Sequence, residues 1–334
     1  MFEILSDASW LKPQIDFLLS LQNLRLQYGS VLNPIFMNIT VFGEYLLPTI
    51  ICSTVYWAIN SKNGMYIFAV SGFNVIFAHL FKLLACVYRP WVLSDKINPF
   101  EAAINHARSY SFPSGHSACS SSTLGALAYV VRKNLWAVIL LITLVLLVGF
   151  SRMWLGVHTP QDIIGGFSIG LIIVFALVPV IDWAENNKNR YLCLAIATDI
   201  IAALILAYLC YFHQYPLDYV NGELLVNPTN ALHTTIACYG YALGVLNGLF
   251  LCRRFLPFDA SAGSLSGKIT RVLTGILILL FLFKYVFEYV WASSLDIKIV
   301  FVIMILLGLF PTIIYPYVFT NIKKYTKEKN VLEK

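Results

Sequence analysis

Residues 135–162 read LWAVILLITLVLLVGFSRMWLGVHTPQD, and this stretch decides the class of fold. The run 135–153 carries no charged side chain before Arg152. A segment of about 20 apolar residues is long enough to cross the hydrocarbon of a bilayer as an α-helix. The polar residues from Ser151 to Asp162 would then lie where such a helix reaches the membrane surface.

The composition of the whole chain agrees with insertion into a membrane. Of the 334 residues, 59% are hydrophobic and only 12% are charged. Soluble domains have about 45–50% apolar and about 25% charged residues. The composition therefore argues against a soluble enzyme, a disordered chain, a nucleic-acid binder and a disulfide-stapled secreted module. The seven cysteines lie in or beside apolar runs and form no CxxC pair, so we expect them to be small buried hydrophobic side chains.

Working outward from 135–153, we count nine apolar runs that approach the length of a membrane span. Long continuous runs predict helices, because the strands of a membrane β-barrel alternate weakly over about ten residues. We therefore predict an all-α, polytopic integral membrane protein with about nine transmembrane helices. The runs are 36–58, 64–88, 116–131, 135–153, 161–181, 191–212, 230–252, 270–292 and 297–319.

A weaker segment, 8–29, precedes these runs and gathers Trp10 and several leucines on one side, with Gln and Asp on the other. This pattern predicts an interfacial amphipathic helix within an N-terminal segment 1–33, although an ordinary polar tail explains it too. The rest divides into a core, 34–183, and a C-terminal extension of about four helices with a basic tail, 184–334.

Basic residues are distributed unevenly between the two sides that nine spans define. The N-terminal side holds the loops 89–115, 154–160, 213–229 and 293–296. Most of the Lys and Arg residues in loops lie on the other side, with the C-terminal tail, and 213–229 contains none. By the positive-inside rule the tail side is cytoplasmic, and the N-terminal side faces outward or into a lumen. We expect a multi-pass protein of the cell membrane.

The first of three polar patterns is KxxxxxxRP, formed by Lys82, Arg89 and Pro90 at the end of the run 64–88. Because seven residues make two helical turns, the two basic side chains should share one helix face, and Pro90 should end the helix. Charges at this depth are costly unless they serve a site. For either residue alone, snorkelling to the interface is the simpler explanation.

The second pattern is Pro113-Ser114-Gly115-His116, directly before the run 116–131. Gly115 allows the backbone to approach a ligand closely, and the N-terminus of a helix presents free N–H groups to an anion. Ser114 alone is also explained as the N-cap of that helix, and the two roles are compatible.

The third pattern is SRxxxxxHxxxD, formed by Ser151, Arg152, His158 and Asp162. The sequence TPQD at its end is a typical helix start, so Asp162 alone is also explained as a capping residue. Asp162 lies four residues after His158, however, and would share its helix face. A carboxylate there can hold one imidazole nitrogen and leave the other as a nucleophile.

Together the three patterns resemble the signature of the phosphatidate phosphatase type 2 superfamily, and the resemblance covers about residues 40–180. This family includes lipid-phosphate phosphatases, undecaprenyl-pyrophosphate and phosphatidylglycerophosphate phosphatases, glucose-6-phosphatase and vanadium haloperoxidases. The resemblance implies a helical-bundle core and a phosphatase that forms a phosphohistidine and uses no cofactor.

The resemblance also implies a role for each matching residue. His158 attacks phosphorus, Asp162 orients it, and His116 protonates the leaving oxygen and then activates water. Three cations supply the charge that Mg²⁺ supplies in other phosphotransfer enzymes, so no metal ligand is expected. The implied phosphate-binding residues are Lys82, Arg89, Ser114, Gly115 and Arg152.

The expected substrate is a phosphate monoester or pyrophosphate of a membrane lipid, such as phosphatidate, phosphatidylglycerophosphate, undecaprenyl pyrophosphate or a sphingoid phosphate. The implied partners are the bilayer and this lipid, with no nucleic acid and no obligate protein partner. Two alternatives stay open. Nine spans with a lumenal site are also the layout of glucose-6-phosphatase, which implies a soluble sugar phosphate. A non-catalytic phosphate-binding or transport protein on the same fold is the other class, against which an intact His158, Asp162 and His116 argue, because binding alone needs only the cations.

Several further ionisable residues lie in or near the predicted spans. We favour structural roles for them, although intramembrane ionisable residues are candidates for function by default. They are His79, His106, Glu44, Asp199 and the pair Lys284 and Glu288.

Overall fold

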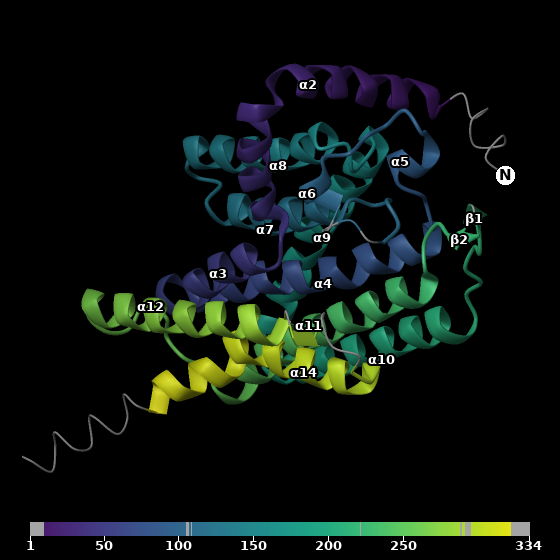
Figure 1. Cartoon of the computed structure of the whole chain (residues 1–334). Helices are drawn as coiled ribbons and strands as arrows, with labels where there is room; N and C mark the ends of the chain where they lie inside the picture. Colours follow the sequence, from purple (N-terminus) through teal and green to yellow (C-terminus); the bar gives the residue numbers. More distant parts are fainter. Residues whose placement is uncertain are drawn as a thin grey trace, which may run out of the picture. The chain divides into compact units, whose positions relative to one another are not determined.

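The computed structural model describes residues 10–104, 107, 109–220, 222–287, 289–290 and 295–321. This part of the chain is helical apart from its connecting loops and one short antiparallel hairpin in which Tyr219 pairs with Leu224 (Figure 1). The long helices are α2 (Lys12–Thr40), α4 (Ser61–Ala85), α7 (Gly115–Val130), α8 (Leu135–Trp154), α9 (Pro160–Glu185), α10 (Asn189–Tyr211), α11 (Pro228–Phe255), α12 (Leu265–Leu282) and α14 (Ile297–Leu309). The shorter elements are η1 (Val41–Gly43), α3 (Leu46–Thr54), η2 (Val55–Ile59), α5 (Pro90–Leu93), α6 (Glu101–Ile104), β1 (Tyr219–Val220), β2 (Glu223–Leu224), η3 (Phe283–Phe287) and η4 (Phe310–Ile314).

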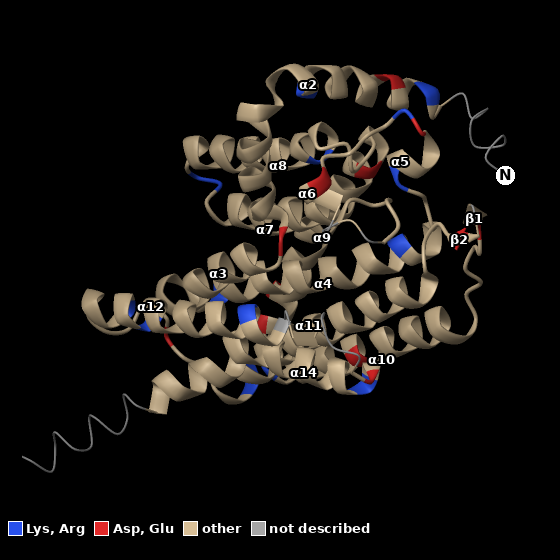
Figure 2. Ribbon diagram, in the orientation of Figure 1, with Lys and Arg blue, Asp and Glu red and all other residues tan. Residues whose placement is uncertain are grey.

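The predicted all-α, polytopic membrane architecture is confirmed, but the count of nine spans is not. Among the described residues, seven helices are long and apolar enough to cross a membrane, or eight if the bent pair Lys12–Gly43 and Leu46–Ile59 forms one span. Figure 2 shows that most of the ribbon of the long helices carries no charged residue.

Helix α7 accounts for one missing span. It has 16 residues, and a helix of that size is about 24 Å long, less than the hydrocarbon thickness of about 30 Å. Most of α7 is buried inside the protein instead of facing lipid. Its serine hydroxyls bond to carbonyls of the preceding turn, as Ser120 does to Ser117 and Ser122 to Cys119, so they need no water.

Contacts divide the chain into two units that interleave along the sequence. Unit 1 comprises Met1–Pro48, Asn74–Val174 and Ile205–Thr235, and unit 2 comprises Thr49–Phe73, Phe175–Leu204 and Ile236–Lys334. The predicted boundaries at 33/34 and 183/184 follow the order of sequence features and stay predictions.

Within unit 1, α8 packs against both α7 and α2. The inner face of α8 is closely packed, because a Cβ at Gly149 would lie 2.5 Å from the ring of Phe167. The outer face bears exposed apolar side chains that suit contact with lipid, namely Leu135, Trp136, Ile139, Leu140, Ile142 and Leu146. Helix α8 thus has one packed face and one exposed face, and its last turn places Arg152 in the interior of unit 1.

The N-terminal helix is longer than predicted. The sequence predicted an interfacial helix over 8–29 and a separate span from 36, whereas α2 runs without interruption from Lys12 to Thr40. Pro34 lies inside it, and α2 visibly changes direction in Figure 1, as expected where a proline removes a backbone donor. The interfacial position of its first half stays a prediction.

Unit 2 is held by close packing between helices. A Cβ built at Gly244 of α11 would lie 2.2 Å from the carbonyl oxygen of Ile305, and one at Gly308 of α14 would lie 2.3 Å from that of Tyr241. Small residues of this kind let membrane helices approach closely. The Trp57 indole also donates to the carbonyl of Pro311 at 2.7 Å.

Candidate active site

All eight residues that the sequence predicted for the site lie in unit 1. Helix α4 carries Lys82 and ends at Ala85, where Cys86 takes a positive φ of 47°. The expectation that Lys82 and Arg89 share one helix face, and that Pro90 ends this helix, is therefore wrong. The left-handed residue stops the helix earlier, and Pro90 is the first residue of α5, a position that suits the fixed φ of proline.

Lys82 binds the segment that precedes α7. Its Nζ donates to the carbonyl oxygens of Tyr110, Ser111 and Pro113 at 3.0, 3.2 and 2.7 Å. An ammonium group has three donors, so these carbonyls satisfy all of them. Through these hydrogen bonds, Lys82 fixes the loop that leads into the second pattern and places a positive charge next to it.

Arg89 reaches the third pattern. Its Nε donates to the carbonyl of Ser109 at 2.8 Å, and its Nη1 donates to the carbonyl of Val157 at 3.0 Å. The same Nη1 lies 2.8 Å from Nε2 of His158. A guanidinium has no acceptor, so Nε2 must accept this bond through its lone pair. The proton of the neutral ring is therefore on Nδ1.

The turn before His158 follows from the way α8 ends. The N–H of Val157 bonds to the carbonyl of Arg152, and the N–H of Gly156 bonds to that of Met153, which is the Schellman arrangement. Gly156 has a φ of 74°, and a Cβ there would lie 3.2 Å from Cα of Pro99. Glycine fits this position, and the turn brings His158 inward, where it is 2% exposed.

Asp162 receives several donors on one oxygen. The Nδ1 of His158 lies 3.3 Å from Oδ2, and the backbone N–H of Thr159 donates to the same atom at 2.8 Å. The N–H of Asp162 faces Oγ1 of Thr159 at 3.4 Å, which completes a capping box. Asp162 is thus both a capping residue and the partner of His158, and the two explanations offered by the sequence hold together.

The second pattern forms the start of α7. Ser114 is the N-cap, because its Oγ accepts from the N–H of Ser117. Its own N–H donates to the carbonyl of Asp162 at 2.9 Å, which joins the second and third patterns. A Cβ at Gly115 would meet no atom within 4 Å, so the backbone there faces open space. His116 lies on the first turn, and its Nε2 is 3.9 Å from Oε1 of Glu44.

Arg152 is buried, with an exposed fraction of 1%. Its Nη1 donates to Oγ1 of Thr40 at 3.0 Å. In the part of the chain that the structure describes, its Nε and Nη2 have no hydrogen-bond partner. A buried charged donor without an acceptor is costly, so this guanidinium is suited to receive an anion.

The electrostatics of the cluster favour an anion and a neutral histidine. Lys82, Arg89 and Arg152 are all buried, and among the described residues Asp162 is the one buried carboxylate beside them. Burial, followed by the charges of Arg89, Arg152, Lys82 and His116, holds the pKa of His158 well below its usual value of 6.5. A neutral imidazole with a lone pair on Nε2 can act as a nucleophile at neutral pH.

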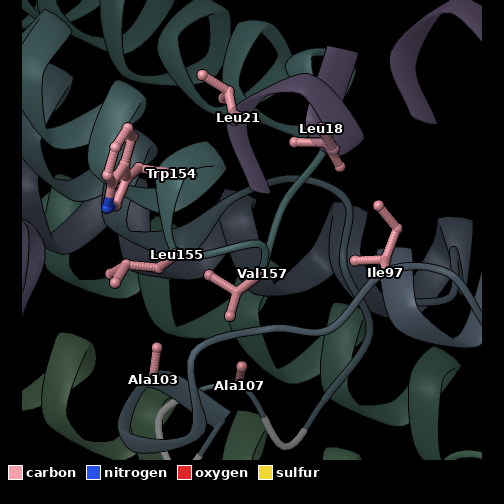
Figure 3. Packing of buried hydrophobic residues seen from close by; sticks show 8 residues of the cluster. All are labelled: Leu18, Leu21, Ile97, Ala103, Ala107, Trp154, Leu155 and Val157. Atoms are coloured by element: carbon pink, nitrogen blue, oxygen red, sulfur yellow. The ribbon is translucent and has the colours of Figure 1, made fainter. Parts of the chain in front are cut away.

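Helix α2 covers the turn that carries His158. Leu18 and Leu21 of α2 belong to one buried cluster with Leu155 and Val157, shown in Figure 3. Polar bonds reinforce it: Nη1 of Arg25 donates to the carbonyl of Trp154 at 3.0 Å, and Nη2 donates to that of Asn98. The N-terminal helix therefore stabilises the position of the candidate nucleophile.

Sequence reasoning missed Ser111. It is fully buried, and its Oγ donates to Oδ2 of Asp162 at 2.6 Å. Ser111 lies outside the three patterns, and its sequence neighbourhood contains other serines, so no feature of the sequence singled it out.

Of the residues for which the sequence favours structural roles, Glu44 lies beside His116 in the candidate site, whereas His79 and Asp199 bond to neighbouring polar side chains. His79 contacts the hydroxyls of Tyr45 and Thr235 at 3.0 and 3.3 Å. Asp199 accepts from Asn247 at 2.7 Å. His106 and Glu288, the proposed partner of Lys284, lie outside the described residues.

Comparison with known proteins gives a family. The PAP2 superfamily model matches residues 63–186, and the model for the PAP2 superfamily phosphatase transmembrane extension matches residues 236–327. Phosphatidylglycerophosphatase B of Bacillus subtilis (strain 168) is 31% identical over 156 residues, which cover 43% of this chain and 72% of that protein. An undecaprenyl-diphosphatase of Sulfolobus acidocaldarius is 26% identical over 152 residues, or 45% of this chain and 71% of that protein. The crystal structure of a transmembrane PAP2-type phosphatidylglycerolphosphate phosphatase from Bacillus subtilis aligns with 55% of this chain and 92% of that one, at 25% identity and a TM-score of 0.42.

Proposed function

Because the chain belongs to the PAP2 superfamily, we propose that it is a membrane phosphatase that hydrolyses the phosphate monoester or pyrophosphate of a membrane lipid. The relatives named above are a phosphatidylglycerophosphatase and an undecaprenyl-diphosphatase. Their names support a lipid that carries a terminal phosphoryl group as the substrate class.

One observation carries the proposal. The buried guanidinium of Arg152 has two nitrogens without a hydrogen-bond partner among the described residues, in a cluster that holds two further cations and a neutral His158. Phosphoryl oxygens supply the acceptors and the charge that this cluster lacks. The open space in front of Gly115, at the N-terminus of α7, suits the same group.

In the first step, Nε2 of His158 attacks phosphorus. The N–P bond forms while the bond from phosphorus to the leaving oxygen breaks, and His116 gives that oxygen a proton. Asp162 holds the Nδ1 proton and stabilises the positive charge that grows on the ring. For this attack the Nη1 of Arg89 must release Nε2, and a phosphoryl oxygen is the acceptor that replaces it.

In the second step, water attacks the phosphohistidine. His116 takes a proton from the water, the new P–O bond forms, and the N–P bond breaks so that the lone pair returns to Nε2 of His158. Lys82, Arg89 and Arg152, together with Ser114 and the Gly115 amide, stabilise the charge on the equatorial oxygens in both steps. This set of cations needs no metal ion or cofactor.

We also propose which side of the membrane the active site faces and how the chain divides into domains. The uneven distribution of Lys and Arg supports an active site and N-terminus on the outer or lumenal side of a cell membrane, with the C-terminus in the cytoplasm. Residues 34–183 form the catalytic core, and 184–334 form a transmembrane extension, in line with the second family model.

Phosphate release by the purified enzyme tests the proposal. The panel comprises phosphatidate, phosphatidylglycerophosphate, undecaprenyl pyrophosphate, sphingosine phosphate and glucose 6-phosphate. We expect release from at least one lipid, none from His158→Ala, and slow release from Asp162→Asn, which keeps the attacking atom. Activity should survive EDTA and be inhibited by vanadate. Full activity of His158→Ala, or binding of phosphate without turnover on any substrate, would contradict the proposal.

A further inference from the structure

Ser111 lies where the three sequence patterns meet. Its backbone N–H donates to the carbonyl of Val87 at 2.7 Å, and its own carbonyl accepts from Nζ of Lys82 at 3.2 Å. Its side chain points to the third pattern, with Oγ 2.6 Å from Oδ2 of Asp162 and 3.3 Å from Nδ1 of His158. The residue is fully buried, so water does not compete for these bonds.

The direction of each hydrogen bond follows from the available donors. Arg89 donates to Nε2 of His158, so Nδ1 carries the ring proton. A hydroxyl has one proton and an ionised carboxylate has none. The Ser111 proton must therefore point to Asp162. The Nδ1 atom of His158, which carries the ring proton, lies 3.3 Å from both Oδ2 of Asp162 and Oγ of Ser111, so either oxygen can accept that proton.

Ser111 also supplies a donor to Asp162 from a different part of the chain. The other two donors to Oδ2 come from His158 and Thr159, which are close to Asp162 in sequence. Ser111 comes from the segment held by Lys82. Without it, the donors that remain on this carboxylate oxygen are those of His158 and Thr159, from the same turn of the chain.

We propose that Ser111 is a positioning residue that holds Asp162 and, through it, keeps the ring of His158 in the tautomer and orientation needed for attack on phosphorus. This inference rests on the proposed function, because it concerns the same reaction. Partners that orient a functional histidine or carboxylate typically contribute about 10- to 100-fold when they are removed, as metal sites show.

The test compares Ser111→Ala, Ser111→Thr and Ser111→Cys, with Ser122→Ala as the matched control. Ser122 is also a fully buried serine, but its hydroxyl bonds to the carbonyl of Cys119 in its own helix. The measured quantities are kcat, KM and the single-turnover rate of phosphohistidine formation on the best lipid substrate. We expect Ser111→Ala to lower kcat and the single-turnover rate at least about tenfold with little change in KM. Ser111→Thr should retain activity, and Ser122→Ala should match the wild type.

A purely structural role predicts a different result. It would lower the amount of folded Ser111→Ala enzyme while leaving its kcat unchanged, or change kcat in Ser111→Thr as much as in Ser111→Ala, and either result would overturn the inference. If Ser111→Ala does not fold, the Thr and Cys variants decide, because Thr keeps the strong donor and Cys does not. Wild-type activity in Ser111→Ala beside an inactive His158→Ala would overturn this inference alone. An active His158→Ala would overturn the proposed function as well.

Discussion

Arg89 donates a hydrogen bond to the nucleophile of the candidate site: its Nη1 lies 2.8 Å from Nε2 of His158, the atom that we propose attacks phosphorus. The bond fixes the ring tautomer in the free enzyme, and it has to be exchanged for a phosphoryl oxygen when substrate binds. The same guanidinium spans Ser109 and Val157 through their carbonyls. One side chain thus links the loop of the second pattern to the turn of the third.

This geometry predicts that Arg89→Lys is not a conservative change. An ammonium group is a compact donor that cannot reproduce a planar fork spanning three acceptors. We expect kcat/KM to fall at least about 100-fold, the usual loss when one preorganised donor is removed from a transition state. The control is Arg132→Lys, an exposed arginine bonded to the carbonyl of Tyr129. Activity of Arg89→Lys close to that of the control would refute the role of the guanidinium.

The lowered pKa of His158 predicts the pH dependence. Burial comes first among its causes, followed by Arg89, Arg152, Lys82 and His116. The imidazole should stay neutral below pH 6.5, so Arg152→Gln, which removes one of these charges, should move the acid limb of kcat/KM to higher pH. The wild type and Arg152→Gln are measured on the same substrate, because the phosphate of the substrate itself titrates near pH 6 and must contribute equally to both profiles. Superimposable acid limbs would show that Arg152 does not act on this histidine.

The same shift has a consequence for folding. The pKa of His158 is lower in the folded protein than in the unfolded chain, so the unfolded chain binds more protons between the two values. Its contribution to the free energy of unfolding is therefore complete above about pH 6.5 and decreases as the pH falls below it. Thermal unfolding in detergent at several pH values, with His158→Gln for comparison, measures this contribution.

Gly156 predicts a link between the end of α8 and catalysis. Its φ of 74° and the nearby Cα of Pro99 leave no room for a Cβ without strain, and a left-handed non-glycine residue costs about 1–2 kcal/mol. Gly156→Ala should lower thermal stability and also kcat, because the shifted turn carries His158. The control is Gly267→Ala, on the first turn of α12, where the nearest atom to a Cβ is Oγ of Ser264 at 3.3 Å. Loss of stability with unchanged kcat in Gly156→Ala would show that the conformation of this turn does not affect catalysis.

The sequence predicted the membrane helices and the site residues from strong local signals. Apolar runs near 20 residues and the spacing of the three patterns depend on chemistry that is visible in the chain itself. The composition of the Ser-rich α7 is apolar enough to predict a membrane span, but its 16 residues fall short of the ~20 that a span typically needs. The interruption after α4 was missed because a left-handed Cys86 has no sequence signal.

Contacts between distant segments were also beyond sequence reasoning. Ser111 is separated from Asp162 by 51 residues, and Arg25 is separated from Trp154 by 129. Only the folded chain brings them together. The pairing of His158 with Asp162 was predicted from a shared helix face, which is wrong, because α9 begins at Pro160 and His158 precedes it. The capping box of Thr159 and Asp162 places the carboxylate beside the imidazole instead.

Cysteine labelling tests the proposed sidedness. Cys193 and Cys210 are exposed, so both are first replaced by serine. In intact cells, an impermeant thiol reagent should then label Ala102→Cys and Gly222→Cys. Ser261→Cys and Glu328→Cys should react only after permeabilisation. The reverse pattern would place the active site in the cytoplasm.

The position of the site near helix ends predicts that substrate enters from the bilayer. Lys82 lies in the last turn of α4, and His158 lies between α8 and α9, so we expect the cluster to lie near the depth of the lipid headgroups. A lipid phosphate can reach it while its acyl chains stay in hydrocarbon, and binding of those chains would help to position the phosphoryl group. We expect kcat/KM for a long-chain lipid phosphate to exceed that for its short-chain analogue at least ~100-fold, about 2.7 kcal/mol. The comparison uses mixed micelles at matched bulk and surface concentrations. Equal rates, or a preference for glucose 6-phosphate, would instead favour a water-filled entrance and a soluble sugar phosphate as the substrate.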